Sequence, residues 1–232
     1  MIVGIFGYDF PHFKTNEIVK NTFFNNFSIG ALFLAPKKNY SDNGSVTSTD
    51  KSSKNKDIRR FCKENNIPVF RVEHDNTSRI EKIVSNNNID IAIIGGARII
   101  NQSVIDKFAL GVVNYHPGRI PETSGLDSLY RAIEYHIPPC VTVHLIDDRV
   151  DAGLFILESV TEVFFDDTLN AIENRILLKQ IELNSIVLNG IERKTFCFPE
   201  IIRPKKNERL SAQEKTKIMH NFNNWKKAFS KK

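Results

Sequence analysis

Two polar side chains stand at the end of an apolar run in the segment Val113–Gly118. The amide of Asn114 and the imidazole of His116 are two positions apart, so both leave the same face of an extended strand. A carboxylate follows later in the chain, at Asp151 in the segment Asp151-Ala152-Gly153. An amide N–H stabilises a developing oxyanion, an imidazole donates or shuttles a proton, and a carboxylate acts as acid or base. The three side chains therefore suit acyl transfer to an amine.

The same side chains also have a purely structural interpretation. Asparagine and histidine occur in turns and as hydrogen-bonded polar residues of a core. What favours chemistry here is the combination of Asn114, His116 and Asp151, since two of them end a strand at the place where open α/β sheets bind ligands.

The elements that must position these residues alternate between apolar strands and amphipathic helices. The strands expected are Ile2–Phe6, Ile29–Ala35, Val69–Val72, Ile89–Gly95, Cys140–Leu145 and Leu154–Val160. The helices expected are Asn16–Phe24, Asp57–Asn66, Ser78–Ser85 and a further one that carries Leu126, Leu129, Tyr130 and Ile133. This alternation predicts an α/β fold with a doubly wound, mostly parallel, Rossmann-like sheet. The polar segment Lys37–Lys56 is expected to be a mobile loop.

The C-terminal part predicts a small strand and helix extension. Asp167 is expected to cap a helix, and Thr195–Ile202 to form a last strand or hairpin. A capping box at Ser211–Glu214 opens a final helix. Its apolar stripe consists of Ile218, Phe222, Trp225 and Phe229. We expect a catalytic domain over residues 1–190 and an extension over 191–232 that either forms a homodimer interface or packs on its own sheet.

The composition is that of an ordinary globular protein, with 41% hydrophobic and 25% charged residues among 232. The net charge of +5 fits an anionic ligand, such as a phosphate, a nucleotide or a polyglutamylated folate, and equally a solvated surface. The three cysteines are far apart, which predicts reduced thiols and no metal site. Neither a signal peptide nor a membrane span is recognisable, so a cytoplasmic protein that binds no membrane is expected.

Three motifs, taken in order, resemble the folate-dependent formyltransferases. They are Asn114-Tyr115-His116-Pro117, then Thr142-Val143-His144, then Asp151-Ala152-Gly153. That family includes glycinamide ribonucleotide, methionyl-tRNA and nucleotide-sugar enzymes. The resemblance implies that 10-formyltetrahydrofolate is the co-substrate, that no metal takes part, and that Asn114, His116 and Asp151 are catalytic. For His144 it implies support of the site, and a satisfied buried histidine stays equally open.

The resemblance also implies where the two substrates bind. Two backbone segments would form the folate pocket, namely Gly95, Gly96, Ala97 and Arg98, and Asp147, Asp148 and Val150. The acceptor would meet Tyr8, Phe10, Gly118, Arg119 and Thr123. The loop after the first strand lacks the small-residue phosphate turn of the glycinamide ribonucleotide enzymes, and Ser124 stands where many family members have arginine.

These departures favour a dTDP- or UDP-linked amino sugar as the acceptor, a substrate class of O-antigen and polysaccharide biosynthesis. A methionyl-tRNA enzyme would need a further RNA-binding module, which the residues after Val160 do not resemble, so no nucleic-acid partner is expected. A glycinamide ribonucleotide enzyme, a formyl-folate hydrolase and a folate- or nucleotide-binding sensor remain as alternatives.

Overall fold

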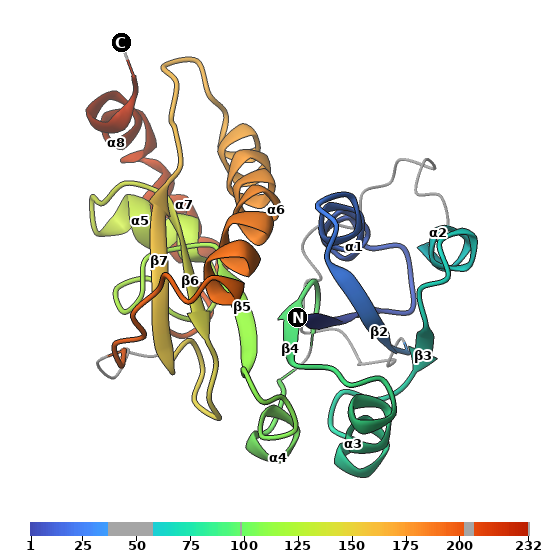
Figure 1. Cartoon of the computed structure of the whole chain (residues 1–232). Coiled ribbons are helices and arrows are strands. Elements are labelled where there is room, and N and C mark those ends of the chain that lie inside the picture. The colour runs from blue at the N-terminus through green and yellow to red at the C-terminus, as the bar shows by residue number, and fades with distance from the viewer. Residues whose placement is uncertain (37–57, 98, 202–206, 232) are drawn as a thin grey trace. The chain divides into compact units, whose positions relative to one another are not determined.

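The computed structural model describes residues 1–36, 58–97, 99–201 and 207–231, and the segment Lys37–Lys56, expected to be a mobile loop, lies outside them. The chain divides into two compact units, Met1–Val113 and Asn114–Lys232 (Figure 1). A seven-stranded sheet has the strand order β3 (Val69–Arg71), β2 (Ser28–Ala35), β1 (Ile2–Tyr8), β4 (Ile91–Ile94), β5 (Val112–His116), β6 (Cys140–Leu145) and β7 (Leu154–Val160). The pairings β1–β2, β1–β4, β2–β3 and β4–β5 are parallel, and β6–β7 is antiparallel. The expected α/β, mostly parallel, Rossmann-like fold is therefore confirmed.

The first unit is built around strands whose central residues are apolar and buried. Its elements are β1 (Ile2–Tyr8), α1 (Phe13–Phe24), β2 (Ser28–Ala35), α2 (Ile58–Glu64), β3 (Val69–Arg71), α3 (Thr77–Asn86), β4 (Ile91–Ile94) and α4 (Gln102–Ile105). The five central residues of β1 are all buried, because α1 and α3 lie on opposite faces of these strands (Figure 1). Continuous apolar runs in the sequence are thus strands covered on both sides.

The second unit holds the strands and helices of the later part of the chain. β5 (Val112–His116) enters it and is followed by α5 (Ser128–Glu134), β6 (Cys140–Leu145), β7 (Leu154–Val160), α6 (Leu169–Glu192), α7 (Ala212–Met219) and α8 (Phe222–Phe229). The long helix α6 packs on β6, and α7 packs on α5. The capping box of Ser211 and Glu214 is formed as expected.

The expectation that Asp167 caps a helix is wrong. The cap of α6 is Thr168, whose hydroxyl accepts a hydrogen bond from the amide of Ala171 at 3.2 Å. Asp167 stands one residue before the cap. Its carboxylate accepts from the amide of Phe164 and from both terminal nitrogens of the Arg175 guanidinium, each within 2.8 Å. A strong ion pair therefore displaces this carboxylate from the capping position.

The expectation of a last strand or hairpin at Thr195–Ile202 is also wrong for the described residues 195–201. Only a single bridge, between Leu154 and Glu200, is formed there. Pro199 has no N–H for a ladder and accepts from the amide of Phe155 at 2.8 Å. Phe196 lies over Gly190 of α6, where a Cβ would come within 2.1 Å of its ring. The segment is thus irregular and is held by the packing of Phe196 and by backbone hydrogen bonds with Gly153 and Phe155.

The final helix of the sequence is two helices, α7 and α8, with a break at His220 and Asn221. Its aromatic stripe still packs inward, and the Trp225 side chain is fully buried with its indole N–H donating to the carbonyl of Ile137 at 2.8 Å. The alternative of packing on its own unit therefore accounts for this stripe. A homodimer stays a prediction, and the aromatic stripe no longer supports it.

Candidate active site

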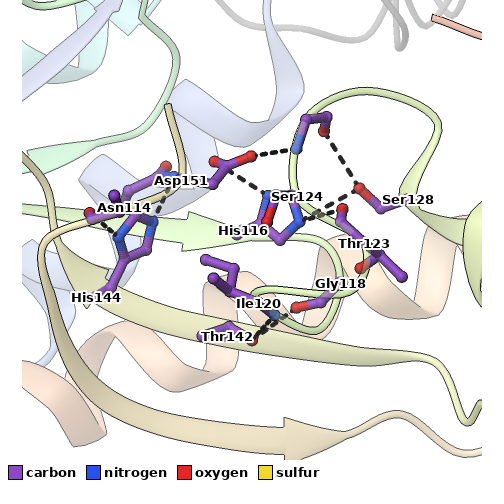
Figure 2. A network of polar contacts seen from close by, with 12 residues as sticks. Asn114, His116, Gly118, Ile120, Thr123, Ser124, Ser128, Thr142, His144 and Asp151 are labelled. Atoms are coloured by element: carbon purple, nitrogen blue, oxygen red, sulfur yellow. Dashed lines mark hydrogen bonds and ion pairs between the residues drawn. The ribbon is translucent and has the colours of Figure 1, made fainter. Parts of the chain in front are cut away.

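β5 presents Asn114 and His116 on one face because Tyr115, which stands between them, faces the other way. Tyr115 is buried, and its hydroxyl donates to Oδ1 of Asn184 in α6 at 3.0 Å. Side chains alternate along a strand, so this bond to α6 turns both neighbours of Tyr115 to the opposite face. Figure 2 shows Asn114 and His116 on that face, close to Asp151.

His116 is buried and both of its ring nitrogens are engaged. Nε2 lies 2.9 Å from the carbonyl oxygen of Thr123, and Nδ1 lies 3.3 Å from Oδ1 of Asp151 (Figure 2). A carbonyl oxygen only accepts, so Nε2 must carry a proton. A second proton must then lie between Nδ1 and the carboxylate, since two lone pairs would otherwise face each other. The His116–Asp151 pair is therefore a store for one mobile proton.

Asp151 is held by the backbone as well as by the imidazole. Its φ of 50° lies in the left-handed region, which aspartate tolerates better than most residues. Its second carboxylate oxygen accepts from the amide of Gly125. Burial raises the pKa of the Asp151 carboxyl, but the hydrogen bond and charge of His116 and the Gly125 amide outweigh burial and hold the pKa below its usual value. The charged carboxylate form of Asp151 is accordingly favoured beside the imidazole of His116.

The amide of Asn114 is oriented by His144. The Nδ1 atom of His144 lies 2.8 Å from the carbonyl of Ala152 and must donate to it, so Nε2 accepts from Nδ2 of Asn114 at 3.1 Å. Burial lowers the pKa of His144 to about 4, which keeps the ring neutral and able to accept. An amide nitrogen has two N–H donors, so this bond aims the amide and one donor is left over for a ligand. The two interpretations of His144 are therefore compatible. It is a buried histidine with both nitrogens hydrogen-bonded, and it orients the amide of Asn114.

The turn after β5 is fastened by Thr142 of β6. Its hydroxyl donates to the carbonyl of Gly118 at 2.7 Å and accepts from the amide of Ile120 at 3.3 Å (Figure 2). Only glycine fits at position 118, because a Cβ there would lie 2.2 Å from Oγ1 of Thr123 and 3.1 Å from Nε2 of His116. Gly118 is therefore needed for the loop to reach back over the imidazole.

The family of this chain follows from a comparison of its sequence. The family model described as formyl transferase matches residues 34–188, which include the whole cluster just described. The chain belongs to the formyl transferase family. Its first strand and its last two helices lie outside the matched range.

Individual relatives match parts of the chain. The phosphoribosylglycinamide formyltransferase of Bacillus subtilis (strain 168) is 31% identical over 87 residues, which are 37% of this chain and 45% of that protein. The enzyme of the same name from Haemophilus influenzae is 26% identical over 102 residues, or 43% and 48%. The matches thus span about half the length of these curated relatives.

Solved structures share the fold over more of the chain. Phosphoribosylglycinamide formyltransferase from Anaplasma phagocytophilum superposes with a TM-score of 0.63 at 16% identity, covering 84% of this chain and 88% of that one. A sugar N-formyltransferase from Shewanella sp. FDAARGOS_354 superposes with a TM-score of 0.61 at 12% identity, covering 95% and 87%. At these identities the likeness is one of fold.

In this member of the family, the residues expected to meet the acceptor already make contacts within the chain. Arg119 pairs with Glu158 of β7 through Nε at 3.0 Å and Nη2 at 2.7 Å. Thr123 is buried and its carbonyl serves His116. Tyr8 and Phe10, in the first unit, stack on each other with ring centroids 4.8 Å apart. Arg119 is thus already neutralised by a carboxylate, and an anionic ligand would have to compete for it.

The two backbone segments expected to hold folate belong to different units. In the first, the amides of Gly95 and Gly96 both donate to the carbonyl of Phe6 at 3.0 Å, and the carbonyl of Ala97 accepts from the Tyr8 hydroxyl at 2.8 Å. Arg98 lies outside the described residues. The backbone groups that were expected to bind folate in this segment therefore already make hydrogen bonds within the first unit.

The second segment, in the loop between β6 and β7, is arranged differently. Asp147 accepts from the amide of Arg149 at 2.9 Å and from its guanidinium. Asp148 and Val150 are exposed and thus accessible to a ligand. Binding of folate by either segment stays a prediction.

Some contributors to the site were missed by reasoning from the sequence. They are the Thr123 carbonyl, the Gly125 amide, the Ser128 hydroxyl 3.4 Å from Nε2 of His116, and Asn207. Backbone groups have no sequence signature, and Asn207 belongs to no motif. Among the described residues, no group of histidine, cysteine and acidic side chains is arranged to hold a metal, and no helix is long and apolar enough to cross a membrane.

Proposed function

We propose that this protein is an N-formyltransferase that uses 10-formyltetrahydrofolate as its co-substrate. The observation that carries the proposal is the contact of 3.3 Å between Nδ1 of His116 and Oδ1 of Asp151, next to the amide of Asn114 that His144 orients. Membership of the formyl transferase family supports it. The co-substrate supplies a formyl group attached to nitrogen, and an amine is the group that accepts it.

The residues of the cluster divide the work of such a transfer. An N–H of Asn114 meets the negative charge that develops on the formyl oxygen when the amine attacks the carbon. The new C–N bond leaves the amine nitrogen with an excess proton, and the departing nitrogen of the donor needs one. The His116–Asp151 pair gives a proton to the departing nitrogen and regains one from the amine, so charge and atoms balance.

As the acceptor we propose the amine of a nucleotide-linked amino sugar. The sugar N-formyltransferase from Shewanella and a Mycobacterium tuberculosis protein described as a likely sugar N-formyltransferase each cover 95% of this chain. A 4-N formyltransferase from Francisella tularensis covers 93%. The phosphoribosylglycinamide formyltransferase structures cover 82–84%. The greater coverage supports a sugar-type enzyme at the level of fold. The stacked pair Tyr8 and Phe10 is the kind of surface on which a base could stack.

A second candidate acceptor is phosphoribosylglycinamide, the substrate for which the relatives from Haemophilus influenzae and Bacillus subtilis are named. Incubation of the protein with 10-formyltetrahydrofolate and a panel of amines separates the two. The panel holds dTDP- and UDP-linked amino sugars and glycinamide ribonucleotide, and mass spectrometry detects the gain of one formyl group. Formylation of glycinamide ribonucleotide with every amino sugar inert would replace the sugar proposal by the purine one.

A further inference from the structure

Asn207 uses every hydrogen-bonding group of its side chain within the second unit. Nδ2 donates to the carbonyl of Glu122 and to the carbonyl of Ser124, both at 2.9 Å. Oδ1 accepts from the hydroxyl of Tyr135 at 3.3 Å. The side chain is 7% exposed, so the bonds are shielded from water. An amide is the side chain that offers two donors and an acceptor together.

The backbone of Asn207 approaches the same loop. Gly125 and Asn207 form an isolated parallel bridge. Gly125 has a φ of +90°, and a Cβ on it would lie 2.6 Å from the carbonyl oxygen of Asn207. Glycine is therefore required at position 125 both for its conformation and for this close approach.

The loop that Asn207 holds is the loop that holds the catalytic pair. Residues 122, 124 and 125 contact Asn207, while the carbonyl of Thr123 accepts from His116 and the amide of Gly125 donates to Asp151. One short segment thus lies between the C-terminal extension and both members of the pair. Any movement of it would change the surroundings of His116 and Asp151 at once.

We propose that Asn207 is a positioning residue for the transfer reaction, and that the C-terminal extension completes the active site by fixing residues 122–125. This inference rests on the proposed function for its kinetic consequence. Removal of Nδ2 leaves the buried carbonyl of Ser124 without its donor, so the loop shifts toward other partners. The pair then loses its alignment, and turnover falls more than substrate binding.

The test compares Asn207→Leu, which keeps the size and branching of the side chain, with two controls. Tyr135→Phe removes only the bond to Oδ1, and Trp225→Phe removes another contact of the extension, the hydrogen bond to the carbonyl of Ile137. Asn207→Leu should lower kcat by on the order of 10²-fold with little change in either KM. Trp225→Phe should lower the melting temperature and leave kcat near wild type. Tyr135→Phe should lower kcat less than Asn207→Leu does, because it leaves both hydrogen bonds of Nδ2 in place.

A second readout does not depend on catalysis. The Asp151 carboxyl faces His116 of β5, His144 of β6 and the amide of Gly125, all of which lower its pKa. Carbon-13 NMR of labelled aspartate should show the pKa of Asp151 rising in Asn207→Leu and unchanged in Trp225→Phe. Should Asn207→Leu fail to fold, Asn207→Ser, which admits water to the two carbonyls, takes its place in both measurements.

The outcomes are distinguishable. A wild-type protein that formylates no amine ends the proposed function, while the Asp151 titration still decides on Asn207. A kcat near wild type in Asn207→Leu together with an unshifted Asp151 overturns the inference, even if the variant melts earlier, because Asn207 would then be only a structural residue.

Discussion

At the scale of single residues, the site depends on which nitrogen carries which proton. His116 and His144 are both buried histidines, yet their partners give them opposite characters. His116 faces a carbonyl and a carboxylate, which both accept hydrogen bonds, whereas His144 faces a carbonyl and an amide donor and is kept neutral by burial. The same residue type thus supplies the proton store in one place and an acceptor that aims Asn114 in the other.

Replacing Asn114 tests the oxyanion role. Asn114→Ala should lower turnover by on the order of 10²–10³-fold, because one preorganised donor is lost. The matched control is Asn189→Ala, which removes an asparagine whose side chain bonds only the carbonyl of Ser185 within its own helix among the described contacts. Steady-state kinetics with the formyl donor measures both. Equal turnover in the two variants would remove Asn114 from the mechanism.

His144 predicts a dependence of stability on pH. Its folded pKa of about 4 lies below the ordinary 6.5, so between these values the unfolded chain binds a proton that the folded chain refuses. Stability should therefore fall as the pH is lowered from 6.5 toward 4, by up to about 1.4 kcal/mol per pH unit from this group. Urea unfolding at several pH values should give a shallower slope for His144→Gln.

The exposed residue His220 provides the control for that series. His220→Gln should keep the wild-type slope between pH 6.5 and pH 4. A slope in His144→Gln as steep as that of the wild type would mean that His144 is not held neutral by burial.

At the scale of elements, β5 is fixed from behind by α6. The bond from the Tyr115 hydroxyl to Asn184 joins two buried side chains. Tyr115→Phe removes the hydroxyl that donates to Oδ1 of Asn184, so it should lower the free energy of unfolding by about 1–3 kcal/mol. Chemical denaturation measures the loss. In the double variant Tyr115→Phe/Asn184→Leu the two losses should be less than additive, and strict additivity would mean that the bond contributes nothing.

The strands were predictable because they are apolar runs, and the same regularity put Asn114 and His116 at the end of β5. Asp151 was found through a motif, and the structure brings it to His116. The loop contacts could not be predicted, because the carbonyl of Thr123 and the amide of Gly125 belong to the backbone that every residue has. Asn207 lies 83 residues after Ser124 in the sequence, and only the fold brings them together.

The two expectations that were wrong, the cap at Asp167 and the strand at Thr195–Ile202, both failed because of tertiary contacts. Asp167 has the right residue type for a helix cap, but Arg175 draws its carboxylate into an ion pair. The apolar segment around Phe196 has the composition of a strand, but the ring of Phe196 packs on Gly190 of α6 and Pro199 has no N–H for a ladder. In each case a tertiary contact outweighs the local preference.

At the scale of the whole molecule, the C-terminal extension is an integral part of the second unit. The Trp225 side chain is fully buried, and its ring packs beside Phe222 and Phe229. Trp225→Ala should therefore lower the free energy of unfolding by about 3–5 kcal/mol. Hydrogen exchange read by mass spectrometry should show faster exchange throughout residues 114–201. Faster exchange confined to the extension would mean that it folds separately.

The central claim is that this chain transfers a formyl group to an amine by means of the His116–Asp151 proton store. The most direct measurement is the rate at which an isotopically labelled formyl group moves from 10-formyltetrahydrofolate to the amines of the panel, for wild type and for Asp151→Asn. The wild type should label at least one nucleotide-linked amino sugar, and Asp151→Asn, still folded by circular dichroism, should be slower by on the order of 10²-fold or more. An unlabelled panel, or equal rates for the two proteins, would contradict the account.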